Sequence, residues 1–171
     1  MKAQLNKLCI HTITTQPWPL DKAIAEYQAH GVPGITVWRQ ALEGFSAAKI
    51  GDQIRTAGMQ VVSLCRGGFF PAPDARDREA AIQDNLLAIE QTAELGAPLI
   101  VLVPGAVPGQ PLEKSRAQIR EGIETILPRA MEHGIQLGIE PLHPMYADSR
   151  SAINSLKQAN DMCDQIDSPN V

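Results

Sequence analysis

The chain has 171 residues and 44% of them are apolar, which fits a single globular domain spanning residues 1–171. Its formal net charge is −4 without any run of Lys or Arg, which disfavours nucleic-acid and anionic-membrane partners because both need a basic patch. The longest apolar stretch, APLIVLVPGAV, is far shorter than the roughly 20 residues of a membrane span, and the N-terminus lacks a signal-peptide pattern. We therefore expect a cytoplasmic protein.

Short apolar runs recur along the sequence and predict the strands of a sheet. In chain order they are KLCIHT (7–12), GITVW (34–38), VVSLC (61–65), LIVLV (99–103) and QLGIE (136–140). A glycine shortly before each of the last four fits the left-handed residue that ends a helix, namely Gly31, Gly58, Gly96 and Gly134. These last four runs lack strict polar alternation, as expected of strands buried on both faces.

The segments between these runs have the spacing of amphipathic helices. Apolar residues recur at offsets of 0, 4, 7 and 11 in residues 82–93 and 119–130, and a shorter version covers 20–27. A weaker pattern in residues 153–166 predicts a further helix, whose candidate N-caps are Asp148, Ser149 and Ser151. Strands alternating with helices predict a parallel sheet with right-handed crossovers.

Two α/β architectures fit this alternation. A five-stranded doubly wound sheet would be complete at this length, whereas a (β/α)8 TIM barrel takes about 250 residues, so only about five of its units would be present. The turn after the first strand, HTITTQPWP, has no glycine, and RGGFFPAP lacks the spacing of a phosphate-binding loop. Polar residues gather where strands end, which is where a barrel keeps its active site: His11, Trp38, Arg39, Arg66 and Glu140. The barrel is therefore favoured.

Three motifs at the predicted strand ends, GITVWR, VSLCRGGFFPA and LGIEPLHPMYADSRSAIN, resemble the xylose isomerase-like TIM barrel superfamily. The similarity is to its sugar phosphate isomerase/epimerase group, and the Glu-Pro-Leu of the last motif is its most specific element. The resemblance covers essentially the whole chain and implies the N-terminal portion of a barrel, truncated after the fifth unit. It also implies that Glu140 binds a divalent metal and is catalytic.

The chemistry implied by the resemblance is isomerisation or epimerisation of a sugar or sugar phosphate. A divalent ion, Mn²⁺ or Mg²⁺ with Co²⁺ or Zn²⁺ as alternatives, would stabilise an enediolate, and a carboxylate would move the proton. The cost of desolvating a charge also favours a metal at Glu140, because a carboxylate buried at the tip of an apolar strand needs a cation or donor beside it. The small-molecule sugar would be held at the barrel mouth by His11, Trp38, Arg39, Arg66 and His143.

Departures from the family pattern leave alternatives open. Epimerases of free ketoses in this family carry a second glutamate six residues after the first, where this chain has Tyr146. The other metal ligands implied by the family lie on strands six to eight, beyond the final SPNV. The chain could therefore be an inactive barrel fragment that needs a partner or further strands, and its unpaired strand edges favour a homo-oligomer. An endonuclease IV-like nuclease is disfavoured, because early strands end in Trp-Arg, Cys-Arg and Val-Pro rather than histidine.

Overall fold

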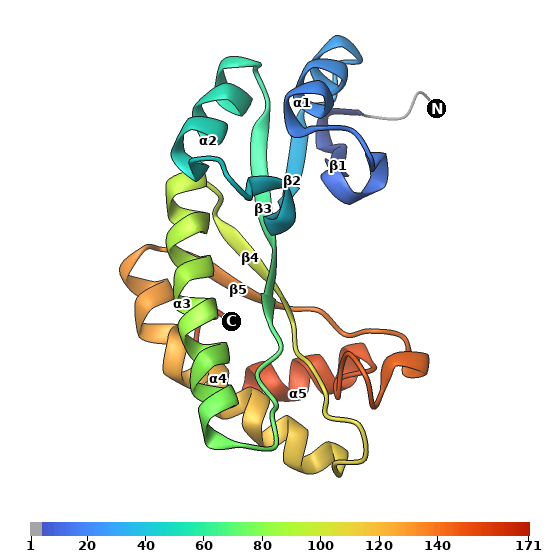
Figure 1. The fold of residues 1–171 in the computed structure, drawn as a ribbon, viewed down its shortest axis with the longest axis vertical. Coiled ribbons are helices and arrows are strands. Elements are labelled where there is room, and N and C mark those ends of the chain that lie inside the picture. The colour runs from blue at the N-terminus through green and yellow to red at the C-terminus, as the bar shows by residue number, and fades with distance from the viewer. Residues whose placement is uncertain (1–4) are drawn as a thin grey trace. The chain divides into compact units, whose positions relative to one another are not determined.

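A computed structural model describes residues 5–171, in which five strands form one parallel sheet in the order β1-β2-β3-β4-β5 (Figure 1). Their bounds are Cys9–His11 (β1), Gly34–Trp38 (β2), Gln60–Gly68 (β3), Leu99–Val103 (β4) and Gln136–Ile139 (β5). All five lie where the apolar runs predicted strands. Because the order follows the chain without the reversal that defines a doubly wound sheet, that alternative is wrong and the barrel topology is confirmed.

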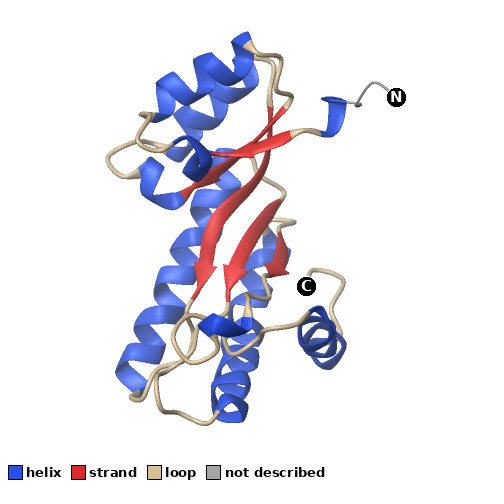
Figure 2. Ribbon diagram, turned by 90° about the vertical axis from the view of Figure 1, so that its right-hand side faces the viewer, coloured by secondary structure: helices blue, strands red, loops and turns tan. Residues whose placement is uncertain are grey.

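Helices follow the strands along the chain, as the alternation predicted. Figure 2 shows the helices in blue and the strands in red. The helices are α1 (Leu20–Ala29), α2 (Ala47–Thr56), α3 (Ala75–Leu95), α4 (Leu112–Glu132) and α5 (Leu156–Ile166). The predicted glycines after the first four have φ between 65° and 78°, so the left-handed helix ends are confirmed. Short 3-10 turns are η1 (Leu5–Lys7), η2 (Thr12–Thr15), η3 (Arg39–Leu42) and η4 (Pro144–Tyr146). Within residues 5–171 no helix is long and apolar enough to cross a membrane.

The start of α5 differs from the prediction. The cap is Ser155, whose hydroxyl accepts a hydrogen bond from the Gln158 N–H at 3.2 Å. Ser151 does not cap the helix because its hydroxyl is bound to the backbone of Ile153, accepting from the N–H at 3.0 Å and donating to the carbonyl at 2.8 Å. Ile153 is fully buried ahead of the helix. The proposed caps Asp148, Ser149 and Ser151 were therefore wrong.

The described residues fall into two compact units. The first contains the chain up to Cys65 together with Gln91–Leu99, and the second contains Arg66–Glu90 and Ile100–Val171. That residues 1–171 form a single domain stays a prediction.

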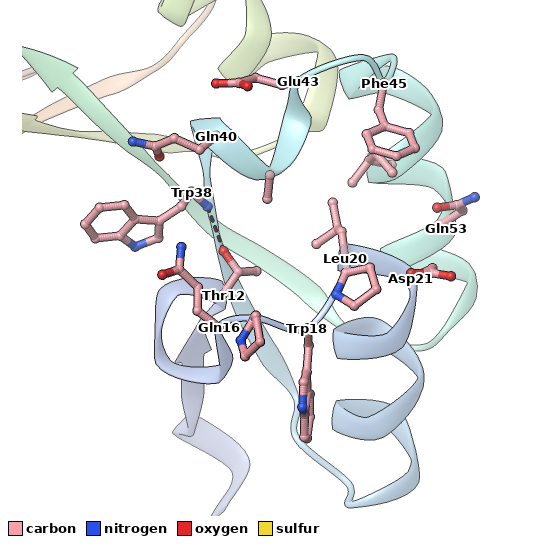
Figure 3. Close-up of a pocket in the computed structure, with 14 residues that line it drawn as sticks. Thr12, Gln16, Trp18, Leu20, Asp21, Trp38, Gln40, Glu43, Phe45 and Gln53 are labelled. Carbon is pink, nitrogen blue, oxygen red and sulfur yellow. Dashed lines mark hydrogen bonds between the residues drawn. The ribbon is translucent and has the colours of Figure 1, made fainter.

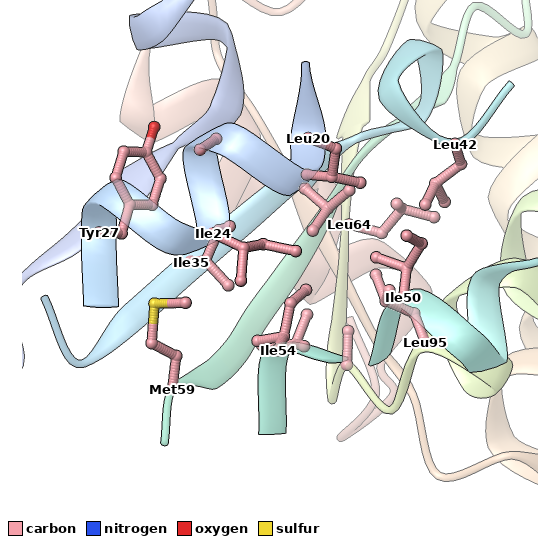
Figure 4. Close-up of a cluster of buried hydrophobic side chains, with 14 of the residues drawn as sticks. Leu20, Ile24, Tyr27, Ile35, Leu42, Ile50, Ile54, Met59, Leu64 and Leu95 are labelled. Carbon is pink, nitrogen blue, oxygen red and sulfur yellow. The ribbon is translucent and has the colours of Figure 1, made fainter. Parts of the chain in front are cut away.

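The core of the first unit joins α1 and α2 to one face of β2 and β3 (Figure 4). Ile35, Ile54 and Leu64 are fully buried there, because the helical period of α2 and the pleat of the strands turn them to the same side. Gly51 of α2 allows the carbonyl of Leu95 to approach the helix, where any Cβ would overlap it. The end of α3 is thereby fixed to α2.

The opposite face of β2 and β3 carries buried hydroxyl groups instead of a purely apolar surface. Thr36 and Ser63 lie opposite one another and their hydroxyl oxygens are 2.8 Å apart. The register shifts between Ile35 and Thr36, and this shift turns Val62 outward as the extra residue of β3. The prediction of strands buried on both faces holds for β2, in which only Trp38 at the end is half-buried, and is wrong for β3, β4 and β5, each of which has partly or fully exposed residues.

In the second unit β3 ends in very close contact with β4. Gly68 has φ of 102°, and a Cβ there would overlap the carbonyl oxygen of Val103. The Phe69 N–H donates to that same oxygen at 2.8 Å. Glycine is thus required at this position by both the backbone angle and the space.

We expect Gly68→Ala to lower the free energy of unfolding by about 3 kcal/mol or more, since strain at positive φ adds to steric overlap. Gly109→Ala is the matched control, because Gly109 has φ of 77° but a Cβ there meets nothing within 4 Å. Gly109→Ala should lower the free energy of unfolding only by the backbone strain, about 1 kcal/mol. Urea unfolding of both variants checks this, and equal losses would contradict the close contact.

Candidate functional site

The predicted site residues divide between the two units. Those in the first unit stand at the ends of β1 and β2 or directly after them: His11, Trp38 and Arg39. Those in the second stand near the end of β3 or after β5: Arg66, Glu140 and His143. Each set is described within its own unit.

In the first unit the ends of β1 and β2 are linked through side chains. The Trp38 indole N–H donates to Nδ1 of His11 at 3.4 Å. The Trp38 backbone N–H donates to the Thr12 hydroxyl at 3.0 Å (Figure 3). Because indole nitrogen only donates, Nδ1 of His11 is the acceptor in this contact. Nε of Arg39 donates to the side-chain oxygen of Gln91 at 2.9 Å, which gives it a structural partner.

A cavity of about 590 Å³ opens in the first unit and is lined by both tryptophans of the chain, Trp18 and Trp38, together with Phe45 (Figure 3). We call it the aromatic pocket. Its walls come from the segments after β1 and β2 and from the starts of α1 and α2. The sequence predicted only Trp38 as a binding residue. The rest was missed because these positions meet only when the two loops fold against each other.

In the second unit Glu140 follows β5 directly, and its backbone N–H donates to the carbonyl of Leu102 in β4 at 2.9 Å. Its side chain is exposed. The premise that this carboxylate is buried was therefore wrong. The reason is local: Gly138 and Ile139 are also only partly buried, so solvent reaches this end of β5.

The other two predicted residues of this unit have structural contacts. Nδ1 of His143 accepts a hydrogen bond from the Met145 N–H at 3.2 Å and so caps η4. The guanidinium of half-buried Arg66 lies over the Phe69 ring, 4.2 Å from its centroid, in a cation–π contact. Their roles toward substrate stay predictions.

Asn85 fixes the end of β3 and was missed by the sequence analysis. Its fully buried side chain accepts from the Gly68 N–H at 2.6 Å and donates to the Gly68 carbonyl at 2.8 Å. The signal that could have found it is a polar residue three positions after Ile82 and four before Ile89, on the apolar face of a helix. Such a residue is buried only if it has hydrogen-bond partners.

Metal-ligating side chains do not cluster in the part of the chain that the structure describes. Within residues 5–171 no three His, Cys, Asp or Glu side chains come together in a way that could hold a metal ion. Catalytic centres of the zinc type take three protein ligands, so the described residues do not form such a centre by themselves. The exposed Glu140 carboxylate is a hard oxygen ligand of the kind that Mn²⁺ and Mg²⁺ accept, and it can supply one ligand.

The sequence pattern of the xylose isomerase-like TIM barrel matches residues 24–171. The chain belongs to this family. The resemblance inferred from the strand-end motifs is thus confirmed. No curated protein matches the chain.

Solved structures agree with this assignment. A protein of Sinorhizobium meliloti 1021 shares 41% identity with a TM-score of 0.92, over 98% of this chain and 62% of that one. D-psicose 3-epimerase from Clostridium cellulolyticum H10, solved with D-tagatose, has 14% identity and a TM-score of 0.82, over 95% and 61% of the two chains. The zinc-bound IolI protein has 20% identity and a TM-score of 0.76, over 95% and 60%. The chain therefore spans about three fifths of these proteins, and the latter two show its fold alone.

We expect Asn85→Leu to lower the free energy of unfolding by about 2–4 kcal/mol, because it leaves the buried N–H and carbonyl of Gly68 without partners. Hydrogen exchange of the Gly68 amide should accelerate at the same time. Asn160→Leu on the exposed side of α5 is the control and should change stability by less than about 0.5 kcal/mol. Unchanged exchange at Gly68 in the Asn85 variant would rule out the proposed anchoring.

Proposed function

We propose that the protein is a metal-dependent isomerase or epimerase acting on a sugar, with Glu140 as a ligand of the metal. The position of Glu140 carries the proposal: it follows the last residue of β5 in a barrel family whose active sites lie at the C-terminal ends of strands. Mn²⁺ or Mg²⁺ are the expected ions, and Co²⁺ or Zn²⁺ are alternatives. The relatives that support this are a sugar epimerase and a zinc-binding protein.

The backbone around Glu140 is anchored, as suits a side chain that must hold a metal ion in a fixed position. Its own N–H is bound to Leu102, and two residues later the Leu142 N–H donates to the Ile153 carbonyl at 3.0 Å. Pro141 between them has a fixed φ. The carboxylate is thus carried by an anchored segment and projects into solvent, where an ion can reach it. A bound divalent ion would polarise a substrate carbonyl and stabilise the enediolate.

A centre with three protein ligands would take at least one of them from outside residues 5–171, because no cluster of three ligating side chains is present within them. Tyr146 stands where free-ketose epimerases of the family have a second glutamate, so 3-epimerisation of a free ketose is not part of the proposal. Its half-buried ring instead lies under the Arg150 guanidinium, 5.5 Å from ring centroid to Cζ. Assembly into a homo-oligomer stays a prediction.

The test is incorporation of solvent deuterium into a panel of aldoses, ketoses and their phosphates, in the presence of Mn²⁺. The chain should be assayed alone and joined to the C-terminal part of the Sinorhizobium meliloti protein that it does not match. We expect exchange in the joined protein, loss on adding EDTA and recovery on restoring Mn²⁺. Glu140→Gln should lower the rate about 10³-fold, because a neutral amide is a poor metal ligand.

Glu132→Gln on the exposed end of α4 is the control for loss of one carboxylate and should leave exchange unchanged. If the joined Glu140 variant exchanges as fast as the joined wild type, the proposed role of Glu140 is wrong. If neither form exchanges any sugar, the alternative of an inactive barrel fragment is favoured.

A further inference from the structure

We infer that the aromatic pocket of the first unit binds an uncharged sugar and rejects its phosphorylated form. The choice of a sugar as ligand rests on the proposed function, whereas the preference for an uncharged one rests on the pocket alone. All residues that line it belong to the first unit, so it is complete within this part of the chain.

The size and walls of the aromatic pocket suit a sugar ring. Its volume of about 590 Å³ lies within the range of small-molecule sites, which are mostly apolar with a few polar groups. Leu20 and Ile50 form buried apolar wall, whereas the rings of Trp18 and Phe45 are 40% and 64% exposed. Exposed aromatic rings offer a flat apolar face to the C–H groups of a sugar.

Hydrogen-bonding groups at the rim of the aromatic pocket also suit a sugar. Gln16, Gln40 and Gln53 line the aromatic pocket with side-chain amides that are exposed at its rim. Each amide can both donate and accept, as sugar hydroxyls do. The hydroxyl of Thr12 accepts from the Trp38 N–H and therefore holds the wall together. An apolar face combined with neutral donors and acceptors favours a polyhydroxylated ligand over a plain hydrocarbon.

The charge of the aromatic pocket disfavours phosphate. Its lining includes the carboxylates of Asp21 and Glu43, and none of its lining residues, all in the described chain, is Lys, Arg or His. The Nζ of Lys22, which is not a lining residue, lies over the Trp18 ring, 4.8 Å from its centroid. The two carboxylates of the lining disfavour a phosphate dianion, because like charges repel. Asp21 also lies in the first turn of α1, where it complements the helix dipole, but Glu43 has no such role.

Intrinsic tryptophan fluorescence tests the inference directly, because both tryptophans of the chain line the aromatic pocket. The probes are D-fructose, D-xylose and methyl β-D-glucopyranoside, with D-fructose 6-phosphate as the charged partner of the first. We expect a saturable change with at least one uncharged sugar in the millimolar range. D-fructose 6-phosphate should give no saturable change.

Two variants, each with a control variant, locate the binding and its charge preference. Phe45→Ala should weaken sugar binding about tenfold, equivalent to about 1.4 kcal/mol. Leu156→Ala, which truncates another exposed apolar side chain, should not weaken it. Glu43→Lys should create saturable binding of D-fructose 6-phosphate, whereas Glu94→Lys, with the same charge change at an exposed position of α3, should not. Circular dichroism and thermal melts confirm that each variant is folded.

Several results would overturn the inference: no saturable change with any of the three sugars, equal binding of the phosphate, or binding unaffected by Phe45→Ala. The proposed function fails separately, through deuterium exchange that does not depend on Glu140. Sugar binding without exchange would leave the aromatic pocket supported while the catalytic proposal fails.

Discussion

The carbonyl groups at the end of β4 determine where the neighbouring segments of the second unit end. The Val103 carbonyl accepts from the Phe69 N–H, and the Leu102 carbonyl accepts from the Glu140 N–H. Successive carbonyls of a strand point to opposite sides, so one strand fixes both neighbours. Gly68 allows this approach because it has no Cβ, and Asn85 binds both backbone groups of Gly68 from α3. The position of Glu140 and the end of β3 therefore depend on adjacent residues of the same strand.

Glu90 and Glu140 of this unit differ in their contacts, and these contacts indicate different roles. Hydrogen bonding from the Arg129 guanidinium lowers the pKa of Glu90, and His133 Nε2 lies 3.3 Å from its other oxygen. That carboxylate is committed to joining α3 to α4. Glu140 is exposed instead, and the backbone rather than an ion pair holds its segment in place. An anchored main chain with a solvent-facing carboxylate is what a metal ligand needs, whereas Glu90 has the contacts of a structural ion pair.

Much of the fold could be predicted because local signals agreed with one another. GITVW and LIVLV became β2 and β4 without a shift of either end, since a left-handed glycine precedes each run and β-branched residues lie within it. Burial could not be predicted in the same way. The sequence around Glu140 is apolar, yet its exposure depends on which elements cover β5. The helical spacing around Asn85 indicates its burial but not its partners, because the N–H and carbonyl of Gly68 are backbone groups that no residue pattern reveals.

Sugar binding in the aromatic pocket and catalysis at a metal centre require different amounts of the chain. The lining of the aromatic pocket falls between Thr12 and Gln53, within the first two strand–helix units. A metal centre needs several ligands that converge from different strands, and residues 5–171 do not bring three of them together. Apolar walls and neutral amides act locally, so a pocket built from two adjacent loops can bind a ligand on its own. Sugar binding can therefore be measured on this chain independently of catalysis, which makes the two proposals separable by experiment.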